Sequence, residues 1–127
     1  MFRRAFSGAT WEKKVGYCRA VRAGNSISVS GTAPVAEGGG VFAPGDAYAQ
    51  AKRCLEILLL ALRELGAGPE HVVRTRMFVT DISRCADYGR AHGEVFAENP
   101  PATSMVEVKA LIEPGMLIEI EADAVVT

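Results

Sequence analysis

The stretch DAYAQAKRCLEILLLALRELG, residues 46–66, predicts a long helix from which the rest of the fold can be worked out. Asp46 can cap the first free amides of this helix, and Gly66 can end it. Its apolar residues recur every three to four positions, as one helix face requires: Ala47, Ala51, Leu55, Leu58, Leu62 and Leu65. Further apolar residues widen this face, so we expect the helix to lie buried across a sheet, with Cys54 as a small core residue and not a nucleophile.

The residues before this helix predict a β-hairpin. Its strands are residues 16–23 and residues 27–30, joined by a turn at Gly24-Asn25 and ended by Gly31. A glycine-rich surface loop then leads to the helix. We expect the basic residues among positions 3–14 to belong to a solvated arm.

Three further strands and a second helix are predicted after Gly66. They are a strand over residues 72–80, a helix that starts near Asp81 or Ser83 and stops before Pro100, and strands over residues 103–111 and 117–126. The order ββαβαββ predicts one α+β domain over residues 1–127, with a mainly antiparallel sheet and both helices on one face. His92 falls in the apolar stripe of the second helix, where we expect a hydrogen-bonded core histidine and not a catalytic one.

Alternation along the last three strands predicts which side chains face the helices. The helix-facing set should comprise Val73, Thr75, Met77, Val79, Val106, Val108, Ala110, Ile118, Ile120, Ala122 and Ala124. The opposite, open face should carry Arg74, Arg76, Phe78, Thr103, Met105, Glu107, Lys109, Glu119, Glu121 and Asp123. Two interpretations of this charged face stay open: a solvated surface with cross-strand ion pairs, or a subunit interface that holds a polar cleft. In the second case a carboxylate with a raised pKa could act as a general base toward water.

Charge and cysteine content narrow the classes of function. The formal net charge is −1, which leaves no basic excess for general nucleic-acid binding. The longest strongly apolar run, residues 57–62, is far too short to span a membrane, and the N-terminal residues do not predict a signal peptide. Three widely spaced cysteines without a Cys-x-x-Cys pair predict a reducing, cytoplasmic location, no disulfide framework and no metal site.

Four segments resemble the reactive intermediate deaminase family, also called the RidA or YjgF family, in the same order and at matching spacings. They are residues 16–31, residues 73–81 (VRTRMFVTD), residues 101–108 (PATSMVEV) and residues 118–125 (IEIEADAV). The resemblance covers nearly the whole chain. It implies a chorismate-mutase-like α+β fold and a homotrimer, in which three sheets close into a barrel and three clefts lie between subunits.

The resemblance also implies a reaction and a site. The family's best-known activity is hydrolysis of 2-imino acids to 2-keto acids and ammonia, without metal or cofactor, so the expected partner is a small molecule. Carried over by position, Glu119 would orient the attacking water, and Ser30 and the Gly31 amide would hydrogen-bond the substrate. Tyr17, from the neighbouring subunit, would wall the pocket.

The sequence departs from the imine-hydrolysing members of the family at three substrate-binding positions. Those members carry an arginine two residues before a cysteine in the Pro-Ala-x-Ser segment, and the arginine holds the substrate carboxylate at two points. Here Thr103 and Met105 stand at these positions, and Gly89 stands where such members often carry asparagine. The chain is therefore expected to belong to a divergent branch that lacks the arginine. Three other arginines could replace its charge: Arg19, Arg74 and Arg76.

Three functions remain open from the sequence. The first is a cofactor-free hydrolase or deaminase of small imines or enamines, the second a non-catalytic trimer that binds a small metabolite, and the third a ribonuclease or translation inhibitor, which the negative charge disfavours. The segment GATWE, residues 8–12, resembles the leader of divergent family branches without the arginine. Its Trp11 could stack on a ligand or fasten the N-terminal arm to a neighbouring subunit.

Overall fold

Helix α2 (Ala47–Glu64) forms where the sequence predicted it, in the computed structural model, which describes residues 1–127. The carboxylate of Asp46 accepts a hydrogen bond from the Ala49 amide at 3.0 Å and so caps the first turn. Gly66 follows the last turn with φ at 83°, the left-handed conformation that favours glycine. The apolar face of α2 is buried as expected, with Cys54, Leu58 and Leu62 all at 0% exposure.

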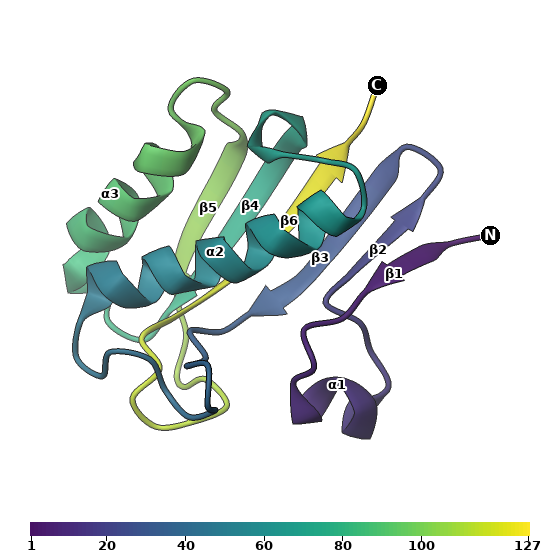
Figure 1. Ribbon diagram of the computed structural model, residues 1–127. Coiled ribbons are helices and arrows are strands. Elements are labelled where there is room, and N and C mark those ends of the chain that lie inside the picture. The colour runs from purple at the N-terminus through teal and green to yellow at the C-terminus, as the bar shows by residue number, and fades with distance from the viewer.

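A six-stranded sheet lies under α2 and a second helix, α3 (Cys85–Phe96) (Figure 1). The strands run in the order β1-β2-β3-β6-β4-β5, and every neighbouring pair is antiparallel except β4 with β5. Their bounds are β1 (Arg3–Ala5), β2 (Ala20–Ala23), β3 (Ser26–Thr32), β4 (Val72–Val79), β5 (Ala102–Glu107) and β6 (Ile118–Val125). Short 3-10 turns, η1 (Pro69–His71) and η2 (Ile82–Arg84), precede β4 and α3. The predicted α+β class, with a mainly antiparallel sheet and both long helices on one face, is confirmed.

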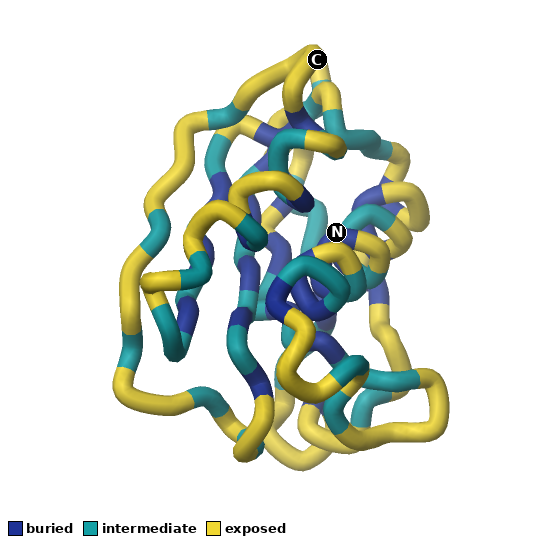
Figure 2. Tube along the Cα trace, turned by 90° about the vertical axis from the view of Figure 1, so that its left-hand side faces the viewer, coloured by how far each residue is buried: buried dark blue, intermediate teal, exposed yellow.

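The buried residues lie between the sheet and the two long helices (Figure 2). Cys54 belongs to this core, as expected, and burial raises the pKa of its thiol well above the ordinary value. His92 is half-buried, and its Nε2 lies 2.8 Å from Thr75 Oγ1, so the prediction of a hydrogen-bonded histidine is also confirmed. No helix combines the length and the apolar character that crossing a membrane requires.

The side-chain faces predicted for β5 are wrong. Thr103 pairs with the buried Thr75 and Met105 with the buried Met77, so these two residues and Glu107 point toward the helix side. Val106 lies on the open face instead, with 46% of its surface exposed. The error arose because the strand ends at Glu107, so the apolar residues beyond it, Val108 and Ala110, say nothing about its faces. The open-face carboxylates are therefore Glu119, Glu121 and Asp123, without Glu107.

The face predicted for Val73 is also wrong. The register between β4 and β6 shifts between Val72 and Arg74, so Val72 points into the core and Val73 is 50% exposed. A bulge of this kind reverses the alternation of side chains on one side of it. The remaining predictions for β4 hold, because Thr75, Met77 and Val79 are buried.

The N-terminal residues form structure that the sequence did not predict. Residues Arg3–Ala5 form the edge strand β1, which pairs with β2, and Thr10–Val15 form the short helix α1. Gly16 ends α1 with φ at 89°, so β2 begins at Ala20 and not at residue 16. The basic residues of this segment are exposed, as expected for a solvated position. The segment is not a separate arm, however, because it adds a strand to the sheet and places α1 beyond the lower end of β1 and β2 (Figure 1).

Candidate active site

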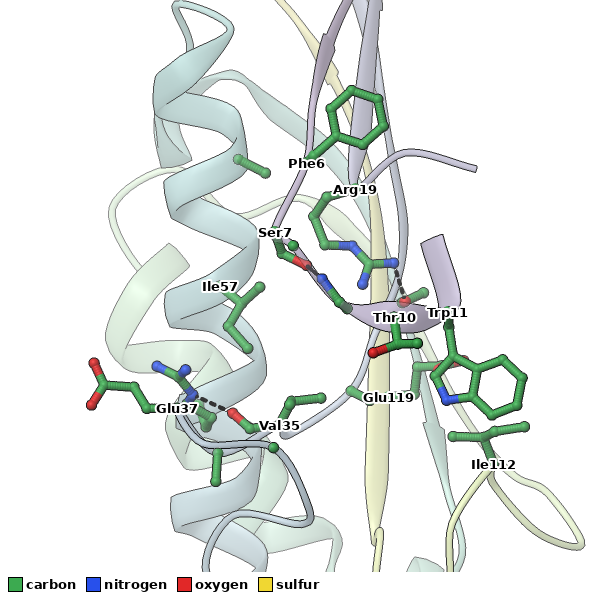
Figure 3. Close-up of a pocket in the computed structure, with 18 of the residues that line it drawn as sticks. Phe6, Ser7, Thr10, Trp11, Arg19, Val35, Glu37, Ile57, Ile112 and Glu119 are labelled. Atoms are coloured by element: carbon green, nitrogen blue, oxygen red, sulfur yellow. Dashed lines mark hydrogen bonds between the residues drawn. The ribbon is translucent and has the colours of Figure 1, made fainter. Parts of the chain in front are cut away.

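A pocket of about 860 Å³ lies where the N-terminal segment, the end of β3 and helix α2 meet. Figure 3 shows Ile57 of α2 on one side of it, and Trp11, Ile112 and Glu119 on the other. Its polar lining includes Arg19, and its apolar lining includes Phe6 and Leu60. This mixture of apolar walls and a few charged groups is typical of small-molecule sites.

Glu119 is the carboxylate that the fold places in this pocket. It lies on the open face of β6, opposite Phe78 of β4, and is partly buried. Burial raises the pKa of Glu119 above its ordinary value, the guanidinium of Arg19 opposes this rise, and the nearby Glu121 adds to it. A half-buried carboxylate with a raised pKa is suited to accept a proton from water.

Gly31 provides the space that Glu119 occupies. The register between β3 and β6 shifts between Val29 and Thr32, and Gly31 lies within that irregular stretch. A Cβ atom at Gly31 would lie 2.7 Å from Glu119 Oε2, which is closer than such contacts allow. The carboxylate therefore sits against bare backbone, a close approach that only glycine permits without displacing it.

Arg19 and Glu12 form a buried ion pair next to Glu119. Arg19 Nη1 lies 3.7 Å from Glu12 Oε2, and the exposed fractions of the two side chains are 8% and 3%. The Glu12 carboxylate also accepts hydrogen bonds from the amide and the hydroxyl of Ser7, which hold α1 against the segment before it. Glu12 was not predicted as a site residue, although it stands in the segment that resembles divergent family leaders.

Contacts within the protein hold the Arg19 side chain in place. Its Nη2 donates to Gly31 O at 2.7 Å, and its guanidinium lies 5.5 Å from the centre of the Tyr17 ring. Its Nε is buried and has no hydrogen-bond partner. Arg76, another candidate to replace the missing arginine, lies on the open face within 3.4 Å of Glu121 and 3.2 Å of Asp123. Of the three candidates only Arg19 lines the pocket.

Of the residues predicted for the site, three meet in this pocket: Glu119, Gly31 and Tyr17, all from one chain. Ser30 lies beside them, and its Oγ donates to Cys18 O at 2.7 Å. The Ser30 amide donates to Arg19 O at 2.9 Å, so this serine holds the chain that carries Arg19. Trp11 also lines the pocket, with 45% of its surface exposed.

The other predicted residues lie at the opposite edge of the sheet, away from this pocket. Thr103 and Met105 belong to the edge strand β5, and Gly89 lies on α3. Thr103 Oγ1 accepts a hydrogen bond from Thr75 Oγ1 at 2.7 Å, and Thr75 in turn contacts His92. One subunit thus divides the predicted site into two groups: a pocket group around Glu119 and an edge group around Thr103.

The two groups offer no metal site. No cluster of three or more His, Cys, Asp or Glu side chains is arranged to hold a metal ion.

Arg53 also lines the pocket, and the sequence did not indicate this role. It lies on α2, where the sequence pattern distinguished only the buried face of the helix from its exposed face. Its Nε donates to Val35 O at 2.8 Å, which anchors the loop after β3 to α2.

Comparison with known proteins identifies the family. Residues 9–126 match the family model described as Endoribonuclease L-PSP, and a solved structure from Mycobacterium tuberculosis, a member of the YjgF/YER057c/UK114 family, matches with a TM-score of 0.90. The chain belongs to the RidA/YjgF family. The Mycobacterium protein is 44% identical, and the match covers 99% of this chain and 100% of that one.

Two curated relatives are similar to this RidA/YjgF-family chain over most of its length. An uncharacterized protein of Streptomyces coelicolor is 35% identical over 122 residues, covering 96% of this chain and 90% of that protein. The 3-aminoacrylate deaminase RutC of Acinetobacter baylyi is 34% identical over 108 residues, covering 85% of each chain. The family therefore includes a protein named for deamination of a small enamine.

Proposed function

We propose that this RidA/YjgF-family chain is a cofactor-free hydrolase of small reactive imines or enamines, acting at clefts between the subunits of a homotrimer. The observation that carries the proposal is Glu119, a partly buried carboxylate of raised pKa set in a pocket against bare backbone at Gly31. The name of the Acinetobacter relative adds that this fold hosts deamination of an enamine.

The reaction needs little activation of the substrate by the protein, because an iminium carbon is already electrophilic. In the proposed reaction the carboxylate of Glu119 takes a proton from water while the water oxygen bonds to the imine carbon. The carbon–nitrogen bond then breaks, ammonia leaves, and a carbonyl compound remains. The hydroxyl of Ser30, which already donates to Cys18, keeps free lone pairs that can accept an N–H of the imine. Holding the water and the substrate next to each other in this way provides much of the rate acceleration over the uncatalysed reaction.

The proposed homotrimer would unite the two groups of site residues. Tyr17, Gly31 and Glu119 lie at one part of the sheet and Gly89, Thr103 and Met105 at the edge beyond it, so a neighbouring subunit is needed to bring them together. The open face of the sheet offers an interface, since it mixes the exposed Val106 with the paired charges of Arg76, Glu121 and Asp123.

Ammonia release from imines tests the function directly. Imines are formed in place from amino acids or from primary amines by flavin-dependent oxidases with catalase, and their breakdown is followed with and without the purified protein. We expect faster ammonia release with at least one class of imine. An active family member serves as the positive control, and no acceleration with any imine would refute the proposal.

A non-catalytic binding protein is the second candidate, favoured by the threonine at position 103, where the family's imine hydrolases hold their substrate with an arginine. In that case small carbonyl compounds would raise the melting temperature and be recovered unchanged. An endoribonuclease, the activity in the family description, fits the pocket less well, because four glutamates and two arginines line it and phosphodiesters carry negative charge.

A further inference from the structure

The two arginines that line the pocket are already engaged by other groups of the protein. Arg19 donates from Nη2 to Gly31 O at 2.7 Å, and its Nη1 lies 3.7 Å from Glu12 Oε2. Arg53 donates from Nε to Val35 O at 2.8 Å, and its Nη1 lies 3.7 Å from Glu56 Oε2. A carboxylate is held best by two adjacent N–H groups of one guanidinium. One nitrogen of each arginine thus donates to a backbone carbonyl, and the Nη1 of each lies beside a glutamate.

The Nε of Arg19 is a buried donor without a partner. The Arg19 side chain as a whole is 8% exposed. A single N–H suits one neutral acceptor, such as a carbonyl or hydroxyl oxygen, and leaving it unpaired is unfavourable. It does not supply the two-point contact that a carboxylate requires.

The charges around the pocket disfavour an anionic ligand. Its lining contains two arginines and four glutamates, Glu37, Glu64, Glu113 and Glu119. The positive charge of Arg19 is shared between Glu119 in the pocket and the buried Glu12. A carboxylate on the substrate would add a third negative group beside this one guanidinium, whereas a protonated imine would pair with Glu119.

The edge group supplies no cation in compensation. Thr103 lies at the position of the family's arginine, and its hydroxyl accepts the hydrogen bond from Thr75. The nearest titratable group in this chain of hydrogen bonds is His92, and burial lowers its pKa, which favours the neutral imidazole. The edge group thus adds no positive charge, and each arginine of the pocket already lies beside a glutamate.

Building on the proposed function, we infer that the site selects small imines or iminium ions that carry no carboxylate. The apolar lining at Phe6, Trp11, Ile57 and Leu60 fits an alkyl or aryl substituent. Hydrolysis would yield an aldehyde or ketone and ammonia. The water oxygen bonds to the imine carbon, both protons of the water pass to the nitrogen by way of Glu119, the carbon–nitrogen bond breaks, and ammonia leaves. The supplying reaction is the two-electron oxidation of a primary amine to its imine by a flavin-dependent oxidase, with oxygen as the electron acceptor.

A matched pair of imines tests this selectivity. An L-amino-acid oxidase converts phenylalanine to an imine with a carboxylate, and a flavin monoamine oxidase converts phenethylamine to the same imine without it. Oxygen uptake by each oxidase shows that both imines are formed. We expect the acceleration per enzyme, kcat/KM, to be at least about tenfold greater for the phenethylamine imine, because the carboxylate meets like charge in the pocket.

The outcomes separate the inference from the proposed function. Equal acceleration of both imines, or a preference for the phenylalanine imine, would overturn the inference and leave the hydrolase proposal standing. Acceleration of neither, with an active family member confirming the phenylalanine assay, would overturn the inference, and the hydrolase proposal falls as well if no other imine is accelerated.

A substitution at Thr103 provides the reciprocal test. Thr103→Arg adds the missing charge at an exposed edge strand, so it should shift the preference toward the phenylalanine imine by about tenfold. Thr103→Gln, a polar side chain without the charge, is the matched control and should leave the preference unchanged. If the arginine variant kept the wild-type preference, the missing positive charge at position 103 would not be what sets the selectivity.

Discussion

At the scale of single residues, Glu119 shows how a carboxylate suited to catalysis reduces the stability of the fold. Burial raises its pKa, so the folded chain holds the proton of this carboxyl more tightly than the unfolded chain does. The folded state is therefore stabilised as the pH falls through the folded pKa, and at neutral pH the charged carboxylate is destabilising. Glutamine at this position removes the charge and keeps the shape.

The variant Glu119→Gln should thus raise the stability of the protein at neutral pH. The gain in the free energy of unfolding should shrink in mildly acidic buffer, where the wild-type carboxyl is protonated as well. Urea unfolding of both proteins at the two pH values measures this difference, with the exposed Glu98→Gln as control. A variant less stable than wild type at neutral pH would show that Glu119 forms a net favourable interaction instead.

Gly31→Ala should damage the site and spare the fold. The added Cβ would lie 2.7 Å from Glu119 Oε2 and push the carboxylate out of place, and displacements of about 1 Å can lower activity about 100-fold. The backbone of Gly31 is not left-handed, so alanine fits its conformation. Imine hydrolysis and urea unfolding are measured together, and we expect a change in stability within about 1 kcal/mol.

Gly93→Ala is the matched control for this substitution. An added Cβ at Gly93 meets nothing within 4 Å, and the residue lies in α3, where alanine is favoured over glycine by about 0.5–1 kcal/mol. It should therefore be slightly more stable and fully active. Equal loss of activity in both variants would remove the special role of Gly31.

At the scale of elements, the sequence predicted best where one signal dominated. Helix α2 has a cap at Asp46, a stop at Gly66 and a continuous apolar face, so its position follows from local chemistry. Strand β6 alternates cleanly, and this placed Glu119 on the open face. Strand β5 could not be oriented in this way, because its faces depend on parallel pairing with β4, which is set by the tertiary fold.

The N-terminal elements were missed because they are too short to show periodicity. Strand β1 has three residues and α1 has six, and the buried Glu12 of α1 is held by a hydrogen bond from Ser7, outside the helix. The pocket depends on this segment, since Phe6, Trp11 and Arg19 line it. Glu119 and Gly31 could thus be predicted from the sequence, but the ion pair between Arg19 and Glu12 beside them could not.

Removing one partner of this ion pair should be strongly destabilising. Glu12→Ala leaves the buried Arg19 without its carboxylate, and breaking buried pairs in this way costs about 3–5 kcal/mol. Urea unfolding at a fixed protein concentration measures the loss, with the exposed Glu98→Ala as a surface control. A loss below about 1 kcal/mol would indicate that Arg19 finds another partner, such as Glu119.

At the scale of the whole molecule, the predicted site residues do not come together within one subunit. The pocket group and the edge group lie in different parts of one sheet, so the proposed cleft needs an element from each of two subunits. The family resemblance predicted this shared cleft. The periodicity of apolar residues could not predict it, because periodicity indicates only the helices and strands of one chain.

Subunit mixing should reveal a shared cleft. Glu119→Gln disables the pocket group. Gly89 of the edge group is exposed and an added Cβ there meets nothing within 4 Å, so Gly89→Trp should fill the space beside it. Each variant alone should be inactive, whereas unfolding and refolding the two together should restore activity, because some clefts then combine two intact groups. Light scattering should give the mass of a trimer for each preparation. Mixtures that stay inactive would contradict a site built by two subunits.

The rate of ammonia release from an accepted imine with the Glu119→Gln protein tests whether Glu119 is the base of the reaction. The substitution keeps the size of the side chain and removes the base, so we expect the acceleration seen with wild type to be lost, while the oligomeric mass is unchanged and the melting temperature is not lowered. Wild-type acceleration by the glutamine variant would show that Glu119 has no part in the reaction.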